Sequence, residues 1–197
     1  MQTIAIATRN KGKYKELAEA LCGLPFKFIS LDEAGIKEDV EETGDTYEAN
    51  AILKAEYFGQ KLLLPTIADD SGIVVEALQG ELGVKTRRFG AGEKASDEKW
   101  LEFFLTRMAN EKNRRACFIS VIALYRPDQK IIIFQGQCQG IILERAAVAL
   151  EIGIPLSSVF LPDGKDMVLS AMPIAEKNAI SHRGQAIEKC IKYLRMQ

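Results

Sequence analysis

The sequence begins with a pattern that restricts the fold strongly, a short buried strand that leads directly into an amphipathic helix. Apolar residues occupy Thr3–Ala7, and apolar side chains recur at helical spacing over Lys11–Cys22. Gly23 to Pro25 break this helix, and Phe26–Ser30 has the composition of a second strand. A strand, a helix and a further strand in succession are the repeating unit of α/β folds. The opening of the chain therefore predicts an α/β protein.

The rest of the chain continues this alternation. Asp45 or Thr46 can cap a helix that ends near Gly59, and Ser96 can cap another that reaches Met108. The other expected elements are a strand over Pro65–Ala68, a turn at Asp69–Gly72, a hairpin of Ala116–Tyr125 and Lys130–Cys138, and a last helix from Ser181 to Leu194. No repeat or linker divides the sequence. We therefore expect one domain over residues 1–197 with a mixed sheet.

Composition excludes several classes of protein. The 26 basic and 27 acidic residues leave a net charge of -1, which gives no overall field toward nucleic acid or an anionic membrane. The four cysteines are far apart in the sequence, and the chain contains one histidine, so neither a zinc site nor a disulfide framework is expected. No leader-like or bilayer-length apolar segment occurs, and we expect a cytoplasmic protein. The near-zero charge disfavours a nucleic-acid-binding module built on Lys11, Lys13, Arg87, Arg88, Arg114 and Arg115.

The junction between the first strand and the first helix is a candidate phosphate site. It reads Thr8-Arg9-Asn10-Lys11-Gly12-Lys13. The free N–H groups and the positive dipole end of a helix start favour an anion, and the lysines add charge. The spacing is not that of a Walker loop, and a solvated helix start carrying lysines also explains it.

Two acidic segments are candidates for metal binding and catalysis. Glu41 and Glu42 precede Gly44, and Asn50 and Lys54 are four residues apart on the next expected helix, so both can face one side. Downstream, Asp69-Asp70-Ser71-Gly72 follows an apolar strand, at the end of the sheet where α/β proteins bind ligands. A few carboxylates suit Mg²⁺, which also keeps water and substrate phosphate as ligands. A polar turn explains either segment taken alone.

A fourth segment places positive side chains at a helix start. Ser181 can cap the last helix, which leaves His182 and Arg183 in its first turn, where the helix dipole disfavours positive charge. An anionic ligand or a hydrogen-bonding base would compensate. A structural role for His182 is the alternative.

Taken together, these segments resemble the inosine triphosphate pyrophosphatase family, whose members remove deaminated purine nucleotides. The resemblance spans almost the whole chain and is carried by residues 7–13, 41–44, 50–55, 68–72 and 176–186. It implies a long twisted mixed β-sheet with flanking helices, two lobes around a central cleft, and usually a homodimer. It also implies Mg²⁺-dependent hydrolysis of non-standard purine nucleoside triphosphates (ITP, dITP and XTP) to the monophosphate and pyrophosphate.

The resemblance also assigns roles to residues. Asp70 would be catalytic, and Glu41, Asp69 and Asp70 would bind the metal. The phosphates would be held by Thr8, Arg9, Asn10, Lys11, Gly12, Lys13, Lys54 and Ser71. The base would face Lys177, His182 and Arg183.

The sequence departs from the family where members carry a Gly-Phe-Gly-Tyr-Asp-Pro stretch that contacts the base. Here the aligned residues are Gly153, Ile154, Pro155, Leu156, Ser157 and Ser158, so the stacking aromatic and the aspartate are absent. Arg9 also replaces a usual glycine. These changes predict an altered base preference. The alternative is a nucleotide-binding or regulatory homologue with little or no turnover.

Overall fold

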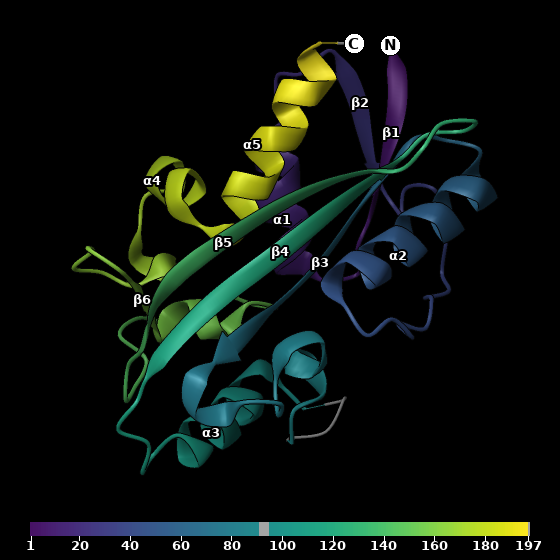
Figure 1. The fold of residues 1–197 in the computed structure, drawn as a ribbon. Helices are drawn as coiled ribbons and strands as arrows, with labels where there is room; N and C mark the ends of the chain where they lie inside the picture. Colours follow the sequence, from purple (N-terminus) through teal and green to yellow (C-terminus); the bar gives the residue numbers. More distant parts are fainter. Residues whose placement is uncertain (91–94, 197) are drawn as a thin grey trace.

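A single mixed sheet of six strands organises the molecule. The computed structural model describes residues 1–90 and 95–196, without the side chains of Lys85, Arg87 and Arg88. The strands are β1 (Gln2–Ala7), β2 (Phe26–Ser30), β3 (Thr66–Val75), β4 (Arg115–Tyr125), β5 (Ile132–Ile142) and β6 (Phe160–Pro162), in the order β2-β1-β3-β4-β5-β6. β1 pairs in parallel with β2 and β3, and the other pairs are antiparallel. The long, twisted β4 and β5 cross the whole molecule (Figure 1), and the predicted mixed sheet is confirmed.

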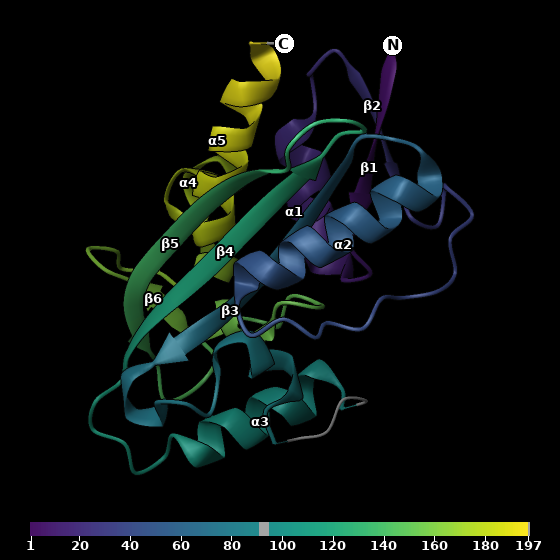
Figure 2. The ribbon, with the colours of Figure 1, turned by 45° about the vertical axis from the view of Figure 1, so that its right-hand side comes forward.

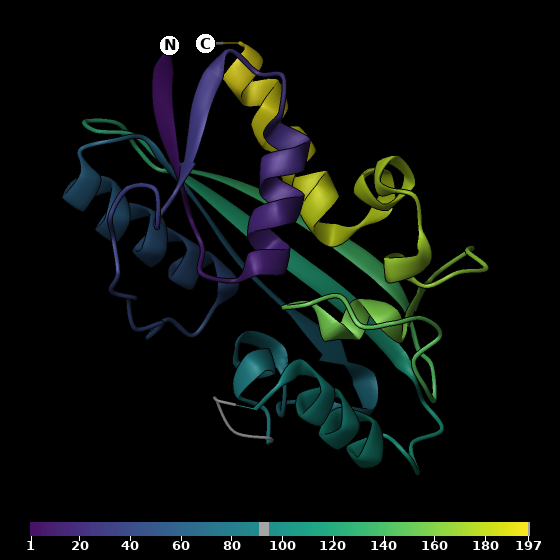
Figure 3. The same cartoon turned by 180° about the vertical axis from the view of Figure 1, so that it is seen from behind.

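The helices cover the sheet on both faces. Their bounds are α1 (Lys11–Leu21), α2 (Tyr47–Leu62), α3 (Asp97–Arg107), α4 (Ile174–Ile180) and α5 (His182–Arg195), with short 3-10 turns η1 (Glu76–Leu78), η2 (Gly83–Arg88), η3 (Pro155–Ser158) and η4 (Leu169–Ala171). α2 packs on one face, and α1 and α5 lie together on the other (Figures 2 and 3). No helix of the described ranges is long and apolar enough to cross a membrane.

The helix starts follow the capping residues in the sequence. The side chains of Asn10, Thr46, Ser96 and Ser181 accept hydrogen bonds from backbone N–H groups in the first turns of α1, α2, α3 and α5. This confirms the predicted caps at Thr46, Ser96 and Ser181. The α2 helix passes the predicted end at Gly59 and ends at Leu62, because Leu63 takes a left-handed conformation that closes it.

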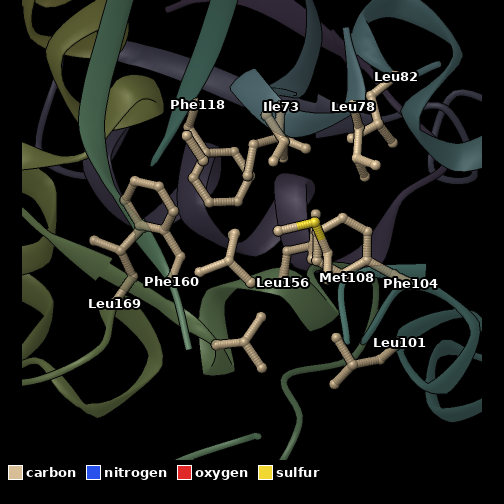
Figure 4. Close-up of a cluster of buried hydrophobic side chains, with 14 of the residues drawn as sticks. Ile73, Leu78, Leu82, Leu101, Phe104, Met108, Phe118, Leu156, Phe160 and Leu169 are labelled. Atoms are coloured by element: carbon tan, nitrogen blue, oxygen red, sulfur yellow. The ribbon is translucent and has the colours of Figure 1, made fainter. Parts of the chain in front are cut away.

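The described residues form three apolar clusters: one packs under α2, and the other two divide the opposite face of the sheet into the predicted lobes. One core joins α1 and α5 to the sheet and contains Leu17, Ile67 and Ile187. The other packs α3 and the 3-10 turns against the far part of β3, β4 and β5; Figure 4 shows it around Phe104, Phe118, Leu156 and Phe160. Side chains of one strand face alternate sides of a sheet, and Ile67 and Ile73 share a side. The two cores therefore lie on the same side of β3, one beyond the other.

The turn predicted at Asp69–Gly72 is wrong. These residues belong to β3, which runs unbroken from Thr66 to Val75 and pairs residue for residue with β4. The polar residues remain in the strand because distant side chains satisfy their hydrogen bonds, which a local propensity does not register. Two elements were not predicted, the three-residue β6 and the short α4.

Candidate functional site

A cavity opens where β1 ends. β1 pairs with β3 only as far as Ala7 and Ala68, so the edge of β3 from Asp69 onward is not covered by β1. The helices that follow β1 and β2 lie on opposite faces of the sheet, which is the arrangement that leaves a crevice in α/β folds. The cavity has a volume of about 320 Å³, and two groups of residues line it: one around the β1–α1 loop and Asp70, and a mainly apolar one that includes Trp100, Phe118 and residues 154–156. After the roles expected from the sequence, we call them the phosphate end and the base end.

The phosphate end begins with the loop between β1 and α1. Thr8, Arg9, Asn10 and Lys13 line the cavity, whereas Lys11 is exposed and is not among the lining residues. Gly12 is buried, and a Cβ there would lie 2.6 Å from the carbonyl oxygen of Ile152. The loop therefore needs glycine at this position for close approach to the 150s segment.

Arg9 is engaged by protein groups. Its guanidinium donates to Oδ1 of Asp32 at 2.5 Å and to the carbonyl oxygens of Ile36 and Glu38 at 2.5 and 2.9 Å. These contacts fix the segment that leads to Glu41 and Glu42. In the structure Arg9 thus orders a neighbouring loop while its side chain borders the cavity.

Asp70 and Lys54 meet on the α2 side of β3. Nζ of Lys54 lies 3.1 Å from Oδ1 of Asp70 and 2.6 Å from Oε1 of Glu42. Asn50 donates to Oδ2 of Asp70 at 3.3 Å and accepts from the N–H of Gly44 at 2.8 Å. Burial, with added repulsion from Glu42 and Asp69, raises the pKa of Asp70 despite the attraction of Lys54. A carboxylate of raised basicity facing a cavity can accept a proton from water.

Asp69 points to the opposite face of β3 and is completely enclosed. Its carboxylate accepts from Oγ of Ser120 at 2.5 Å and lies 3.0 Å from Nζ of Lys13 and 3.6 Å from Nε of Arg183. Burial opposes ionisation of Asp69, but Lys13 and Arg183 outweigh it and hold its pKa well below the usual range. Asp69 is therefore an anion whose oxygens already have protein partners.

The structure separates the two adjacent glutamates. Glu42 lines the cavity, whereas Glu41 is exposed and does not. Among the residues that the structure describes, no group of three or more His, Cys, Asp or Glu side chains is arranged to hold a metal ion. The carboxylates that face the cavity are those of Asp70, Glu42 and Asp39.

The C-terminal segment contributes a buried network. Arg183 donates to Oγ of Ser71 at 2.8 Å and to Oε2 of Glu16, and Nζ of Lys177 lies 2.6 Å from Oε1 of Glu16. Burial opposes ionisation of Glu16, but Arg183 and Lys177 hold its pKa low. Arg183 and His182 line the cavity, whereas Lys177 lies outside it and also pairs with Glu151 at 2.9 Å.

The base end contains the residues that replace the family's aromatic stretch. Ile154, Pro155, Leu156 and Ser157 line it, together with Val84, Trp100, Phe118 and His182. Gly153 joins this end to the rest: its carbonyl accepts from Asn10 at 2.8 Å and its N–H donates to Asp97 at 2.6 Å. This end is therefore an apolar recess tied to both the phosphate loop and α3.

Glu16, Ser120 and Trp100 are among the residues of this site that sequence reasoning missed. Glu16 lies on the buried side of α1, and an acid there beside Lys13 was a usable signal. Ser120 and Trp100 carried no local signal, because each reaches the site through strand pairing or helix packing. The basic residues weighed for nucleic-acid binding have other roles where they are described: Arg114 donates to backbone carbonyls and Arg115 pairs with Asp163. The side chains of Arg87 and Arg88 lie outside the described part.

An α/β sheet with a capped phosphate loop, paired acids and lysines, and an apolar recess beside them defines a nucleotide-binding protein of the phosphohydrolase type. Comparison with known proteins gives the family. The model of the Ham1 family matches residues 4–193, and the chain belongs to this family. The resemblance stated from the motifs is thereby confirmed.

Individual relatives agree with this assignment. The chain is 40% identical to a dITP/XTP pyrophosphatase of Deinococcus deserti, over 93% of this chain and 85% of that protein. It is 39% identical to a dITP/XTP pyrophosphatase of Geobacter sulfurreducens, over 95% and 94%. A HAM1 protein from Coxiella burnetii has the same fold, with a TM-score of 0.86 and 34% identity over the full length of both chains.

Proposed function

We propose that this chain hydrolyses non-standard purine nucleoside triphosphates, ITP, dITP and XTP, to the monophosphate and pyrophosphate. The observation that carries the proposal is Asp70, whose raised pKa and position in the cavity beside Lys54 suit a base toward water. The names of the relatives, dITP/XTP pyrophosphatase, agree with this activity. In the reaction a water oxygen bonds to the α-phosphorus, the bond from that phosphorus to the bridging oxygen breaks, and pyrophosphate leaves.

The chain's residues divide this work by position. Asp70 orients the water and takes its proton. Lys13, Lys54 and the N–H groups at the start of α1 hold the phosphate chain, and Arg183 positions Ser71 and Asp69 behind it. Charge-assisted hydrogen bonds of this kind fix the phosphates relative to Asp70.

We propose Mg²⁺ as the cofactor. The contacts of Lys54 support a cation site here. Its ammonium group bridges the carboxylates of Asp70 and Glu42, so oxygen ligands already converge on a positive charge at this place. Asp70 would hold the ion together with Glu41 or Glu42, and Asp69 would support the site from the other face of β3. Mg²⁺ commonly takes one or two carboxylates with water and phosphate, and when bound it would neutralise charge on the phosphates. Glu41→Gln and Glu42→Gln, compared for their Mg²⁺ dependence, decide which glutamate is the ligand.

The decisive experiment measures pyrophosphate release from ITP, XTP, dITP, ATP and GTP with and without Mg²⁺. Asp70→Asn should lower kcat by about 10²- to 10⁴-fold, the usual contribution of a general base. Asp163→Asn is the matched control, an exposed aspartate paired with Arg115. Undiminished turnover in Asp70→Asn contradicts the assigned role. Calorimetric binding of ITP without hydrolysis would instead establish a nucleotide-binding homologue.

We further propose a homodimer located in the cytoplasm, where nucleotide pools are held. Light scattering at micromolar concentration tests the dimer, since a mass near twice the 21.9 kDa chain is expected. A mass of one chain contradicts it.

A further inference from the structure

Trp100 is a residue of the cavity lining whose indole nitrogen has no hydrogen-bond partner among the described residues. It lies in the first turn of α3, is 2% exposed and lines the same cavity as Asp70. Its Nε1 is buried, and no residue in the described ranges accepts from it. An indole N–H can only donate, and a buried donor is costly to leave unpaired. A ligand acceptor would complete it.

The position of the ring is fixed by packing. The indole stacks on Phe104, with 5.6 Å between centroids and 7° between planes, and belongs to the core that includes Leu156. The start of α3 is tied to the 150s segment, because Asp97 accepts from the N–H of Gly153. The packing therefore fixes the indole ring beside the recess.

His182 supplies the second unpartnered polar atom at this end. Its ring stacks on Phe118 at 4.6 Å, and Nδ1 has no partner among the described residues. Burial and the neighbouring Arg183 lower the pKa of His182 to about 3, so the ring is neutral. A neutral imidazole presents either a donor or an acceptor at a given nitrogen, depending on its tautomer. His182 can therefore adapt to a base, whereas Trp100 cannot.

We propose that Trp100 is a specificity-determining residue of this chain, whose indole N–H donates to a carbonyl oxygen of the base. This inference rests on the proposed function and names the residue that selects oxo-bases where the family's aromatic and aspartate are missing. An amino group at the same place would set donor against donor and leave Nε1 unpaired. Sites built to hydrogen-bond one substrate group reject the analogue that lacks it.

The kinetic test uses Trp100→Phe, which keeps an aromatic ring and removes the donor. We expect kcat/KM for ITP to fall by about 5- to 100-fold, the equivalent of one lost buried hydrogen bond. The value for ATP should change less than about twofold, so the ITP to ATP ratio falls. Phe104→Leu is the control, because it disturbs the same stack without touching a donor, and it should leave the ratio unchanged. An unchanged ratio in Trp100→Phe overturns the inference.

A binding test works on the unaltered protein, because Trp100 is its only tryptophan. Titration with ITP in the presence of a chelator should shift the tryptophan emission, whereas tripolyphosphate, which has no base, should bind with little change. Equal responses to the two ligands overturn the inference. If no triphosphate is hydrolysed but the ITP-specific shift occurs, the proposed function fails while the base contact stands.

Discussion

The carboxylates at the phosphate end of the cavity have partners within the protein, whereas two buried nitrogens at the base end have none among the described residues. At the phosphate end, Asp69 and Asp70 both have cationic and neutral partners within the protein. At the base end, Trp100 and His182 each keep a buried nitrogen without a partner in the described structure, among apolar neighbours. Every nucleoside triphosphate has the same phosphates, so a preformed network suits all of them. The bases differ, and a buried nitrogen without a protein partner can be paired only by a base that presents the matching group.

The largest effect is expected from removing a buried carboxylate at the phosphate end. Asp69→Asn removes the central anion from Lys13 and Arg183, which leaves buried positive charge uncompensated, and should lower the free energy of unfolding by about 3 to 5 kcal/mol. Urea denaturation with comparison of midpoint and slope measures it. Asp163→Asn, at an exposed ion pair, should cost far less. Equal losses in the two variants would show that the network contributes no more than a surface pair.

The next prediction concerns Gly153, whose hydrogen bonds join the phosphate loop to the base end and to α3. Gly153 has φ of +83°, and a Cβ there would lie 2.4 Å from Oδ1 of Asn10. Gly153→Ala should therefore destabilise by about 2 to 3 kcal/mol, through backbone strain and the clash. Gly164→Ala is matched in φ at +72° but meets open space, so about 1 kcal/mol is expected. Thermal unfolding of both variants measures the loss of stability, and KM for ITP shows whether substrate binding is altered as well. Equal shifts in melting temperature for the two variants would contradict a role for Gly153 in joining the two ends of the cavity.

A substitution of Lys54 tests whether the phosphate end treats all nucleoside triphosphates alike. Lys54→Met should lower kcat/KM by about 10- to 100-fold for every triphosphate alike, because the lost charge faces phosphate and Asp70. It should also move the acidic limb of the pH profile upward, since Lys54 lowers the pKa of Asp70. Lys61→Met, on the same helix and paired with Glu38, is the control. A loss that depends on the base would contradict the division of the cavity into two ends.

The smallest effect concerns His182 and pH. Its pKa falls from about 6.5 in the unfolded chain to about 3 in the folded one, so below pH 6.5 the unfolded state binds the extra proton. Stability should therefore fall as the pH drops from 6.5 toward 3, by about 1.4 kcal/mol per unit for this group. Comparing unfolding of the parent and His182→Gln at pH 7 and pH 5 isolates the contribution. If the parent and His182→Gln lose the same stability between pH 7 and pH 5, His182 is not kept neutral in the folded protein.

Local signals in the sequence predicted the parts of the fold that local chemistry determines. Caps at Thr46, Ser96 and Ser181 were readable because a side chain bonds to a backbone group a few residues away. The break assigned to Asp69–Gly72 was wrong because their partners, among them Lys13, Ser120 and Arg183, are distant in sequence. The polar segments that the sequence singled out do meet around one cavity, although the side chains of Glu41, Lys11, Lys177 and the enclosed Asp69 do not line it. The sequence placed Trp100 on the apolar face of a helix but did not predict that it lines the cavity.

The bond between Glu16 and Arg183 spans 167 positions of the chain. A ribosome releases the first of these residues long before the second. Until α5 emerges and packs, Glu16 and Asp69 have no guanidinium opposite them, and hydration is the favourable state for both carboxylates. The nucleotide cavity is therefore one of the last features to form during synthesis, and a prematurely terminated chain that lacks α5 keeps the earlier motifs without the Arg183 that joins them.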